Sequence, residues 1–220
     1  MTPVPANPRS RSRLGLSREA IVDAASELLD EHGLAGVTMR RVAERLGVGA
    51  MTLYGYFRDK DTLLDAIIDA TGAEVALPAP DGDWKTRLRG LMIALHDQLL
   101  EHPFLVELRL RRPIVSPEAM RWTEAALAIL HRAGLPPGQA ARAFRPLFVY
   151  TFGHAAFAPR EDERGVVSRA RAAVLSLPPD EFPLVTSAAQ ELADVLVGQE
   201  PYELGLDLLL DGIENHLAKR

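Results

Sequence analysis

Apolar residues recur every three to four positions along most of the chain, which is the period of amphipathic α-helices. Ser17 can cap a first helix that Gly33 is expected to end, and Thr38 can cap a second. Gly47 allows a tight turn before a third, short helix over residues 49–56. No segment alternates between apolar and polar residues as a strand would, so the pattern predicts an all-α protein.

The same pattern divides the chain into parts. A fourth helix is expected after Asp59, and the stretch 77–83, rich in Pro, Gly and Asp, interrupts the periodicity after it. Further helices are expected over residues 84–101, from about residue 103, and over residues 119–133, 137–156, 166–176, 181–197 and 201–218. We therefore expect a disordered basic arm over residues 1–16, a three-helix head over residues 17–62 and a larger helical body over residues 63–220.

The second and third helices have the form of a helix-turn-helix, in which the first helix braces a second that enters the major groove of DNA. Arg40 could pair with guanine through two hydrogen bonds. Lys60 would place a charge at the start of helix four, where backbone N–H groups favour an anion. The hydroxyls of Thr52 and of the two tyrosines can donate to phosphates. The expected DNA contacts on the head are Thr38, Arg40, Ala50, Met51, Thr52, Tyr54, Gly55, Tyr56 and Lys60.

The charge distribution favours one local contact with a polyanion. The net charge is −5, yet residues 1–60 carry nine Lys and Arg against seven Asp and Glu. Arg9, Arg11 and Arg13 in the arm could follow the phosphates or enter the minor groove. An ordinary helix pair with solvated arginines would show the same charges, so charge alone leaves both interpretations open.

One stretch of the head resembles a known family. From Val37 it reads Val-Thr-Met-Arg-Arg-Val-Ala, then Leu-Gly-Val, then Thr-Leu-Tyr-Gly-Tyr-Phe-Arg-Asp-Lys-Asp-Thr-Leu-Leu. This is similar to the N-terminal domain of the tetracycline-repressor (TetR) family of transcriptional regulators, over residues 17–68. The resemblance implies a homodimeric repressor that leaves a palindromic operator when a small molecule binds the C-terminal domain. Gly49, Gly55 and Tyr56 depart from the residues common in the family, so relatives do not predict the operator sequence.

The final helix is the most apolar segment of the chain, which suggests a contact with a second subunit. It also resembles the last helix of the TetR-like C-terminal domain, and the resemblance implies a two-fold interface between this helix and that of residues 137–156. The expected interface residues are Leu206, Leu209, Leu210, Ile213 and Leu217. Such a dimer would place two recognition helices about 34 Å apart, the spacing of a palindrome. Burial of this helix within its own body is the alternative.

The resemblance further implies a ligand cavity inside the body. Candidate lining residues combine aromatic, leucine and a few polar side chains, as small-molecule pockets do: His96, Leu99, Leu100, Phe104, Leu108, Trp122, Leu147, Phe148, Thr151, Phe152 and His154. The same composition is typical of a hydrophobic core. The tetracycline repressors bind a drug–magnesium chelate, but the corresponding stretch 108–115 holds no histidine, so we expect no obligatory metal and no cofactor.

Other classes of function fit the residues less well. The chain has no cysteine, which excludes disulfides and thiol chemistry, and no nucleophile elbow or phosphate loop indicates an enzyme. No apolar run reaches the roughly 18 residues that span a bilayer, and no signal peptide opens the chain, so a cytoplasmic protein is expected. A helical small-molecule-binding protein or an enzyme without DNA binding remains the alternative.

Overall fold

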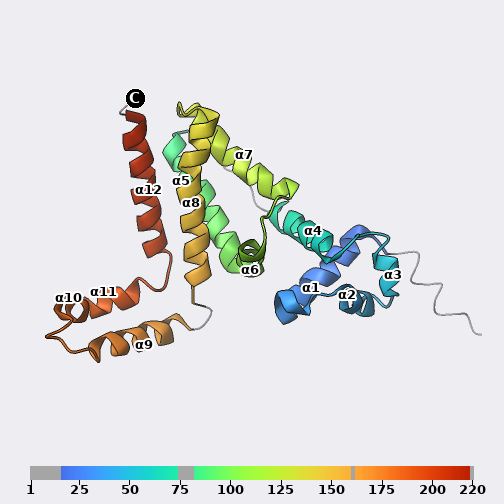
Figure 1. Ribbon diagram of the computed structural model, residues 1–220, viewed down its shortest axis with the longest axis horizontal. Helices are drawn as coiled ribbons and strands as arrows, with labels where there is room; N and C mark the ends of the chain where they lie inside the picture. Colours follow the sequence, from blue (N-terminus) through green and yellow to red (C-terminus); the bar gives the residue numbers. More distant parts are fainter. Residues whose placement is uncertain (1–15, 74–81, 160–161, 219–220) are drawn as a thin grey trace, which may run out of the picture. The chain divides into compact units, whose positions relative to one another are not determined.

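The computed structural model describes residues 16–73, 82–159 and 162–218, and the described residues form helices without strands. The helices are α1 (Arg18–Gly36), α2 (Met39–Arg45), α3 (Ala50–Leu53), α4 (Lys60–Ala73), α5 (Trp84–Glu101), α6 (Phe104–Arg111), α7 (Pro117–Arg132), α8 (Pro137–Phe157), α9 (Glu163–Leu175), α10 (Pro183–Ser187), α11 (Ala189–Asp194) and α12 (Glu200–Ala218) (Figure 1). The predicted all-α class is confirmed. None of the described helices is long and apolar enough to cross a membrane.

Contacts within the chain define two compact units. The first contains residues 1–76 together with residues 107–122, and the second contains residues 77–106 and 123–220. Helices α6 and α7 each run from one unit into the other. The sequence placed the boundary between head and body at residue 62, whereas the structure groups α4 with the head.

Local capping explains where the head helices begin and end. The Ser17 hydroxyl accepts a hydrogen bond from the Ala20 N–H, and the Thr38 hydroxyl accepts one from the Arg41 N–H, as the sequence predicts. Gly33 and Gly47 have φ of 65° and 64°, in the left-handed region that favours glycine, and they break α1 and form the turn after α2. The third helix is shorter than expected, because residues 54–56 form a turn instead of a second helical turn.

The second unit is built around α5, α8 and α12, which lie side by side (Figure 1). The helices α5 and α12 are joined by ion pairs: Arg89 bonds Glu203 and Asp207, and Lys85 bonds Asp211 and Glu214. These pairs fix the register of α12 along α5, while apolar side chains fill the space between the helices. Helix α8 continues through Pro146.

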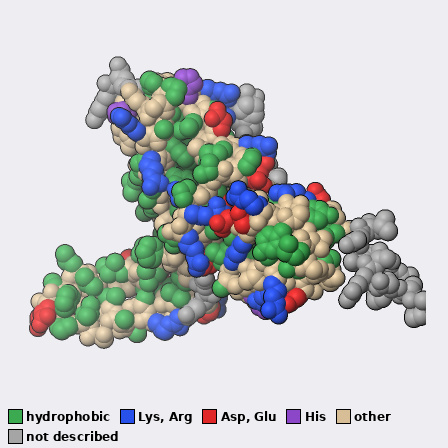
Figure 2. All heavy atoms as spheres, turned by 45° about the vertical axis from the view of Figure 1, so that its right-hand side comes forward, with side chains coloured by type: hydrophobic (Ala, Val, Ile, Leu, Met, Phe, Trp, Pro, Cys, Tyr) green, Lys and Arg blue, Asp and Glu red, His purple; other side chains and the backbone are tan. Residues whose placement is uncertain are grey.

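The helices α9, α10 and α11 form a group that leaves much apolar surface exposed. Hydrophobic side chains cover much of the face of this segment seen in Figure 2. Only Ala189 and Ala193 are buried among the residues of these three helices. The large apolar residues exposed on these three helices are Leu175, Leu184, Val185 and Leu192.

Candidate DNA-reading surface and effector site

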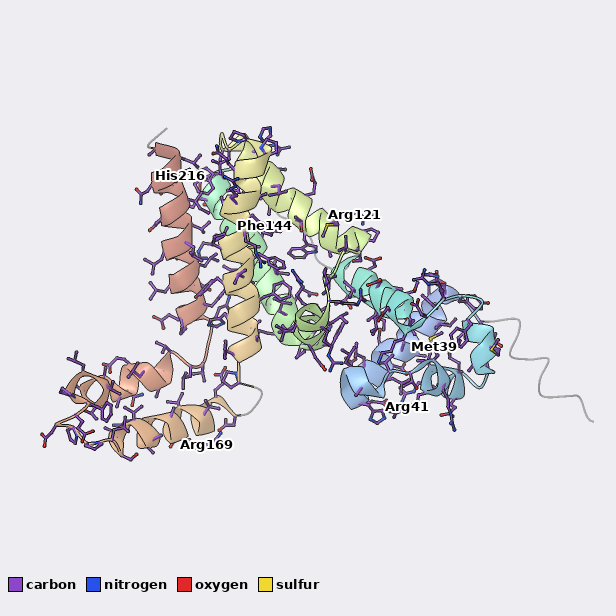
Figure 3. All side chains as sticks on the ribbon, in the orientation of Figure 1. Met39, Arg41, Arg121, Phe144, Arg169 and His216 are labelled. Carbon is purple, nitrogen blue, oxygen red and sulfur yellow. The ribbon has the colours of Figure 1, made fainter. Side chains whose placement is uncertain are left out.

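The buried side of α2 and α3 fixes the orientation of the reading surface. Val42, Leu53 and Phe57 are fully buried, as expected for the anchors of a helix-turn-helix. The opposite side of α3 therefore faces out, and it exposes Met51, Thr52 and Tyr54. Figure 3 labels two residues of α2, the buried Met39 and the half-buried Arg41.

Tyr56 takes part in the internal bonding of the head. Its hydroxyl donates to the Leu16 carbonyl at 2.9 Å, and its own carbonyl accepts from Arg18 Nη1 at 2.7 Å. The Arg18 guanidinium also lies 4.0 Å from the centre of the Phe57 ring. Tyr56 thus ties the start of α1 to the end of the reading segment, and its O–H cannot donate to a phosphate while that bond holds.

Lys60 also bonds inside the head. Its ammonium donates to the Leu34 carbonyl at 2.8 Å, and burial, followed by the charge of Arg111, lowers the pKa of Lys60. Lys60 does begin α4 as expected, but its side chain is directed to α1. Arg58, two residues earlier, is 86% exposed and pairs with Asp59 at 2.8 Å.

The arginines of α2 differ in how free their guanidinium groups are to contact DNA. Arg40 is exposed and its Nε donates to Glu44 at 2.7 Å, a bond that raises the pKa of Arg40. Nη1 and Nη2 of Arg40 make no hydrogen bond with the described residues and can approach a base edge. Arg45 is instead held by Glu27 and Glu31 on α1. The arm residues Arg9, Arg11 and Arg13 lie outside the described residues.

In the body, three of the effector candidates come together. His96 on α5 and His154 on α8 are joined ring to ring, Nε2 to Nδ1, at 2.9 Å. Thr151 Oγ1 lies 2.9 Å from the hydroxyl of Tyr202, whose ring stacks on His96 with centroids 3.8 Å apart. The Tyr202 hydroxyl donates to the Met92 carbonyl. The cluster therefore links α5, α8 and α12 through polar groups.

The two histidines of this cluster are neutral at physiological pH. Burial, followed by the neighbouring His154, lowers the pKa of His96 to about 4, and burial also lowers the pKa of His154. His96 Nδ1 is buried without a hydrogen-bond partner. Tyr202 was not among the predicted site residues, although its position four residues before Leu206 in the apolar stripe of α12 is a signal of burial.

The other effector candidates are more dispersed. Phe148 and Phe152 form an aromatic row with Phe144 along α8, with centroids 5.7 Å and 4.5 Å apart (Figure 3 labels Phe144). In this second unit, Leu99 and Leu147 are buried core, Phe104 is half-buried and Leu100 is exposed. Leu108 and Trp122 belong to the first unit, with α4. The described residues hold no group of three or more His, Asp or Glu side chains that could bind a metal.

The outer face of α12 differs from the expected interface. Leu206 and Leu210 are fully buried in their own chain, and Leu209, Ile213 and Leu217 are half-buried. The exposed leucines are Leu204 and Leu208, at 63% and 65%. The expected stripe included the inward side of the helix because leucines occur on nearly its whole circumference.

A separate set of contacts docks residues 107–122 onto α4, all within the first unit. Arg112 bonds Asp65 at 2.7 Å, and the carboxylate of Asp69 accepts from the Glu118 N–H at 3.1 Å. Asp69 thereby satisfies a free amide in the first turn of α7. Asp65 and Asp69 are four residues apart and share one face of α4.

Comparison with known proteins agrees with this arrangement. Residues 21–67 match the family of bacterial regulatory proteins named tetR, and residues 77–217 match the tetracyclin repressor-like C-terminal domain. The chain is 30% identical to the tetracycline repressor protein class C of Escherichia coli, over 90% of this chain and 91% of that one. An HTH-type transcriptional regulator of Saccharopolyspora erythraea is 38% identical over 127 residues, which are 57% of this chain and 54% of that protein.

Among solved structures, the fold is similar to ActR, a TetR family protein of Streptomyces coelicolor, in complex with actinorhodin. The TM-score is 0.79 with 27% identity, and the match covers 91% of this chain and 96% of ActR. The chain therefore belongs to the tetracycline-repressor (TetR) family: it is a ligand-responsive, DNA-binding transcriptional repressor and not an enzyme.

Proposed function

We propose that this repressor acts as a homodimer on a palindromic operator in the cytoplasm, and that a small molecule in its body releases it. The main support for the dimer is the exposure of Leu204 and Leu208 on α12. The opposite face of α12 is already fully buried within the chain. Val149 is exposed on α8, the helix beside α12. Apolar residues on two adjacent helices suit a second copy related by two-fold symmetry.

Release requires that the effector bind the DNA-incompetent state more tightly than the competent one. The contacts of Arg112 with Asp65 and of Glu118 with Asp69 support a route for this coupling. They tie α4 to segments of α6 and α7, and both of these helices continue into the body. A change at the body ends of α6 and α7 would then shift α4 and the head.

We propose an effector with a flat ring system and few charges. The aromatic row on α8 offers ring surfaces, and the neutral His96–His154 pair offers hydrogen bonds without a net charge. ActR has been solved with actinorhodin, and one relative is named for tetracycline, so these two compounds are the first probes. Since residues 108–115 hold no histidine, tetracycline with magnesium is expected to bind no better than tetracycline alone.

The test is operator binding by purified full-length protein. An operator selected from random duplexes should be palindromic, bind two chains, and lose most affinity when cut to one half-site. Actinorhodin, tetracycline and a panel of ring compounds are then titrated into the complex. A non-palindromic operator bound by one chain would refute the dimer, and a compound that binds the protein without lowering operator affinity would refute its role as inducer.

A further inference from the structure

The recognition helix exposes an apolar side chain at its second residue. Met51 is 82% exposed, the largest exposed fraction among the large apolar side chains of the described head. It follows Ala50, the first residue of α3, and N-terminal residues of a recognition helix are those that reach base edges. The methionine side chain is long and flexible, so it can adapt to a surface in front of it.

The segment around Met51 lacks the side chains that usually distinguish bases by paired hydrogen bonds. Residues 46–57 contain no Arg, Lys, Asn, Gln, Asp, Glu or His. Paired recognition of guanine or adenine by this segment is therefore impossible, since it requires Arg, Lys, Asn or Gln. What α3 can offer is the hydroxyls of Thr52 and Tyr54 and the apolar surfaces of Ala50 and Met51.

The charged side chains near α3 do not supply the paired hydrogen bonds that this helix lacks. Arg45 is engaged by Glu27 and Glu31, and Lys60 bonds the Leu34 carbonyl. Arg40, near the start of α2, is exposed and suits guanine. Within the described head, the groups that remain in front of α3 are the hydroxyls of Thr52 and Tyr54, which do not discriminate strongly between bases, and the apolar surfaces of Ala50 and Met51. In the major groove the one apolar feature that distinguishes bases is the 5-methyl group of thymine.

We propose that Met51 is a specificity-determining residue that reads a thymine by packing on its 5-methyl group. Each operator half-site then contains a T·A pair in front of α3, and the methyl group, more than the hydrogen-bonding edge, is what the protein recognises. This inference rests on the DNA-binding function and goes beyond it by naming the base and the group that is read.

The experiment removes single methyl groups from an operator selected by the full-length protein. Each thymine is replaced in turn by deoxyuridine, which keeps its base pairing and loses only the methyl. We expect one thymine per half-site at which binding weakens about fourfold, and about fifteenfold when both half-sites are changed. Replacing that T·A pair by 5-methylcytosine·guanine should bind about fourfold more tightly than unmethylated cytosine·guanine, because the methyl is restored without the thymine edge.

The variant Met51→Ala tests whether the dependence on the methyl group comes from Met51. In this variant the thymine and deoxyuridine operators should bind within about twofold of each other. Leu110→Ala is the matched control, because Leu110 is 79% exposed on α6 and the truncation is similar. That variant should keep the full dependence on the methyl.

Two results would overturn the proposal: no thymine at which deoxyuridine weakens binding, or a methyl dependence that persists in Met51→Ala. Failure to select any specific duplex would be a different outcome, since it would refute operator recognition itself.

Discussion

Lys60 shows how one internal hydrogen bond can take a cation away from the DNA surface. Its ammonium bonds the Leu34 carbonyl, whereas the Arg58 guanidinium is exposed beside it. Arg58→Ala should therefore flatten the slope of log affinity against log salt by about one phosphate contact. Lys60→Met should leave that slope unchanged and lower the free energy of unfolding by about 1 kcal/mol, since the carbonyl loses its partner.

The salt slope comes from operator titrations at several salt concentrations, and stability from urea unfolding. Arg40→Ala is the comparison for base reading and should relax sequence preference in addition to weakening binding. A flattened salt slope in Lys60→Met would show that Lys60 contacts a phosphate after all.

His96 makes stability depend on pH. In the folded state its pKa is about 4, so it stays neutral where an unfolded histidine, with a pKa near 6.5, takes up a proton. Stability is therefore complete above about pH 6.5 and falls as the pH decreases towards 4, by about 2 kcal/mol at pH 5 from His96 alone. His154 acts in the same direction, while Asp97, whose raised pKa comes from burial and Glu203, acts in the opposite one.

The measurement is urea unfolding at about pH 7.5 and about pH 5, at one protein concentration because a dimer unfolds in a concentration-dependent way. His96→Phe should reduce the loss of stability between these two conditions, whereas His216→Gln, on the exposed end of α12, should not. If His96→Phe loses as much stability between the two pH values as the unmodified protein, groups other than His96 cause the pH dependence.

The sequence identified several of these residues but not their partners. Lys60 bonds a carbonyl 26 residues away, and Tyr56 bonds one 40 residues away. A backbone carbonyl is present at every residue, so no side-chain pattern marks which one will be the acceptor. Thr38, by contrast, caps the helix that directly follows it, and such local contacts are visible in a sequence.

At the scale of elements, a side chain of α4, Asp69, caps the first turn of α7. Asp69→Ala should free the Glu118 N–H and speed amide exchange in the first turn of α7. Asp69→Asn should preserve protection, because its amide carbonyl can still accept. Hydrogen exchange followed by mass spectrometry measures both.

If this contact carries the coupling, Asp69→Ala should also raise the effector concentration needed for release by about fivefold, a loss of about 1 kcal/mol of coupling. Gln190→Ala is the control, because the hydrogen bond between Gln190 and Asp194 lies within α11. Equal effects in both variants would exclude a specific role for Asp69.

Most elements could be predicted because helical periodicity and glycine positions are local signals. Gly33 and Gly47 have the positive φ that their places in the pattern suggest. The length of α3 could not be predicted, because the bonding of Tyr56 to the start of α1 favours a turn where the sequence permits another helical turn. The docking of residues 107–122 on α4 depends on charges spread along a helix face, which resemble a solvated surface in the sequence.

At the scale of the whole molecule, the proposed dimer is the feature expected to have the widest effect on function. Leu204→Glu combined with Leu208→Glu places two charges on the exposed face of α12. The variant should be monomeric in analytical ultracentrifugation and bind the operator about a hundredfold more weakly, since the second head is no longer held near its half-site. Circular dichroism should remain unchanged, because both residues are exposed.

Leu110→Glu, an exposed leucine on α6, should leave the dimer intact. A double variant that is still dimeric would place the interface on another face. The sequence predicted α12 as the interface helix, but leucines around nearly its whole circumference hid which side remains free.

The first unit is assembled from two separate stretches of the chain, residues 1–76 and residues 107–122. A hybrid gene that exchanged only the first stretch with a related regulator would pair a foreign α4 with the native Arg112 and Glu118, and the bonds made by Asp65 and Asp69 would be lost wherever the foreign α4 lacks these carboxylates. Transfer of the head with these bonds intact therefore requires that residues 107–122 be exchanged together with residues 1–76, or that the foreign α4 already carry acidic residues at both positions. An exchange of operator specificity between related regulators is thus expected to involve a segment in the middle of the gene as well as its start.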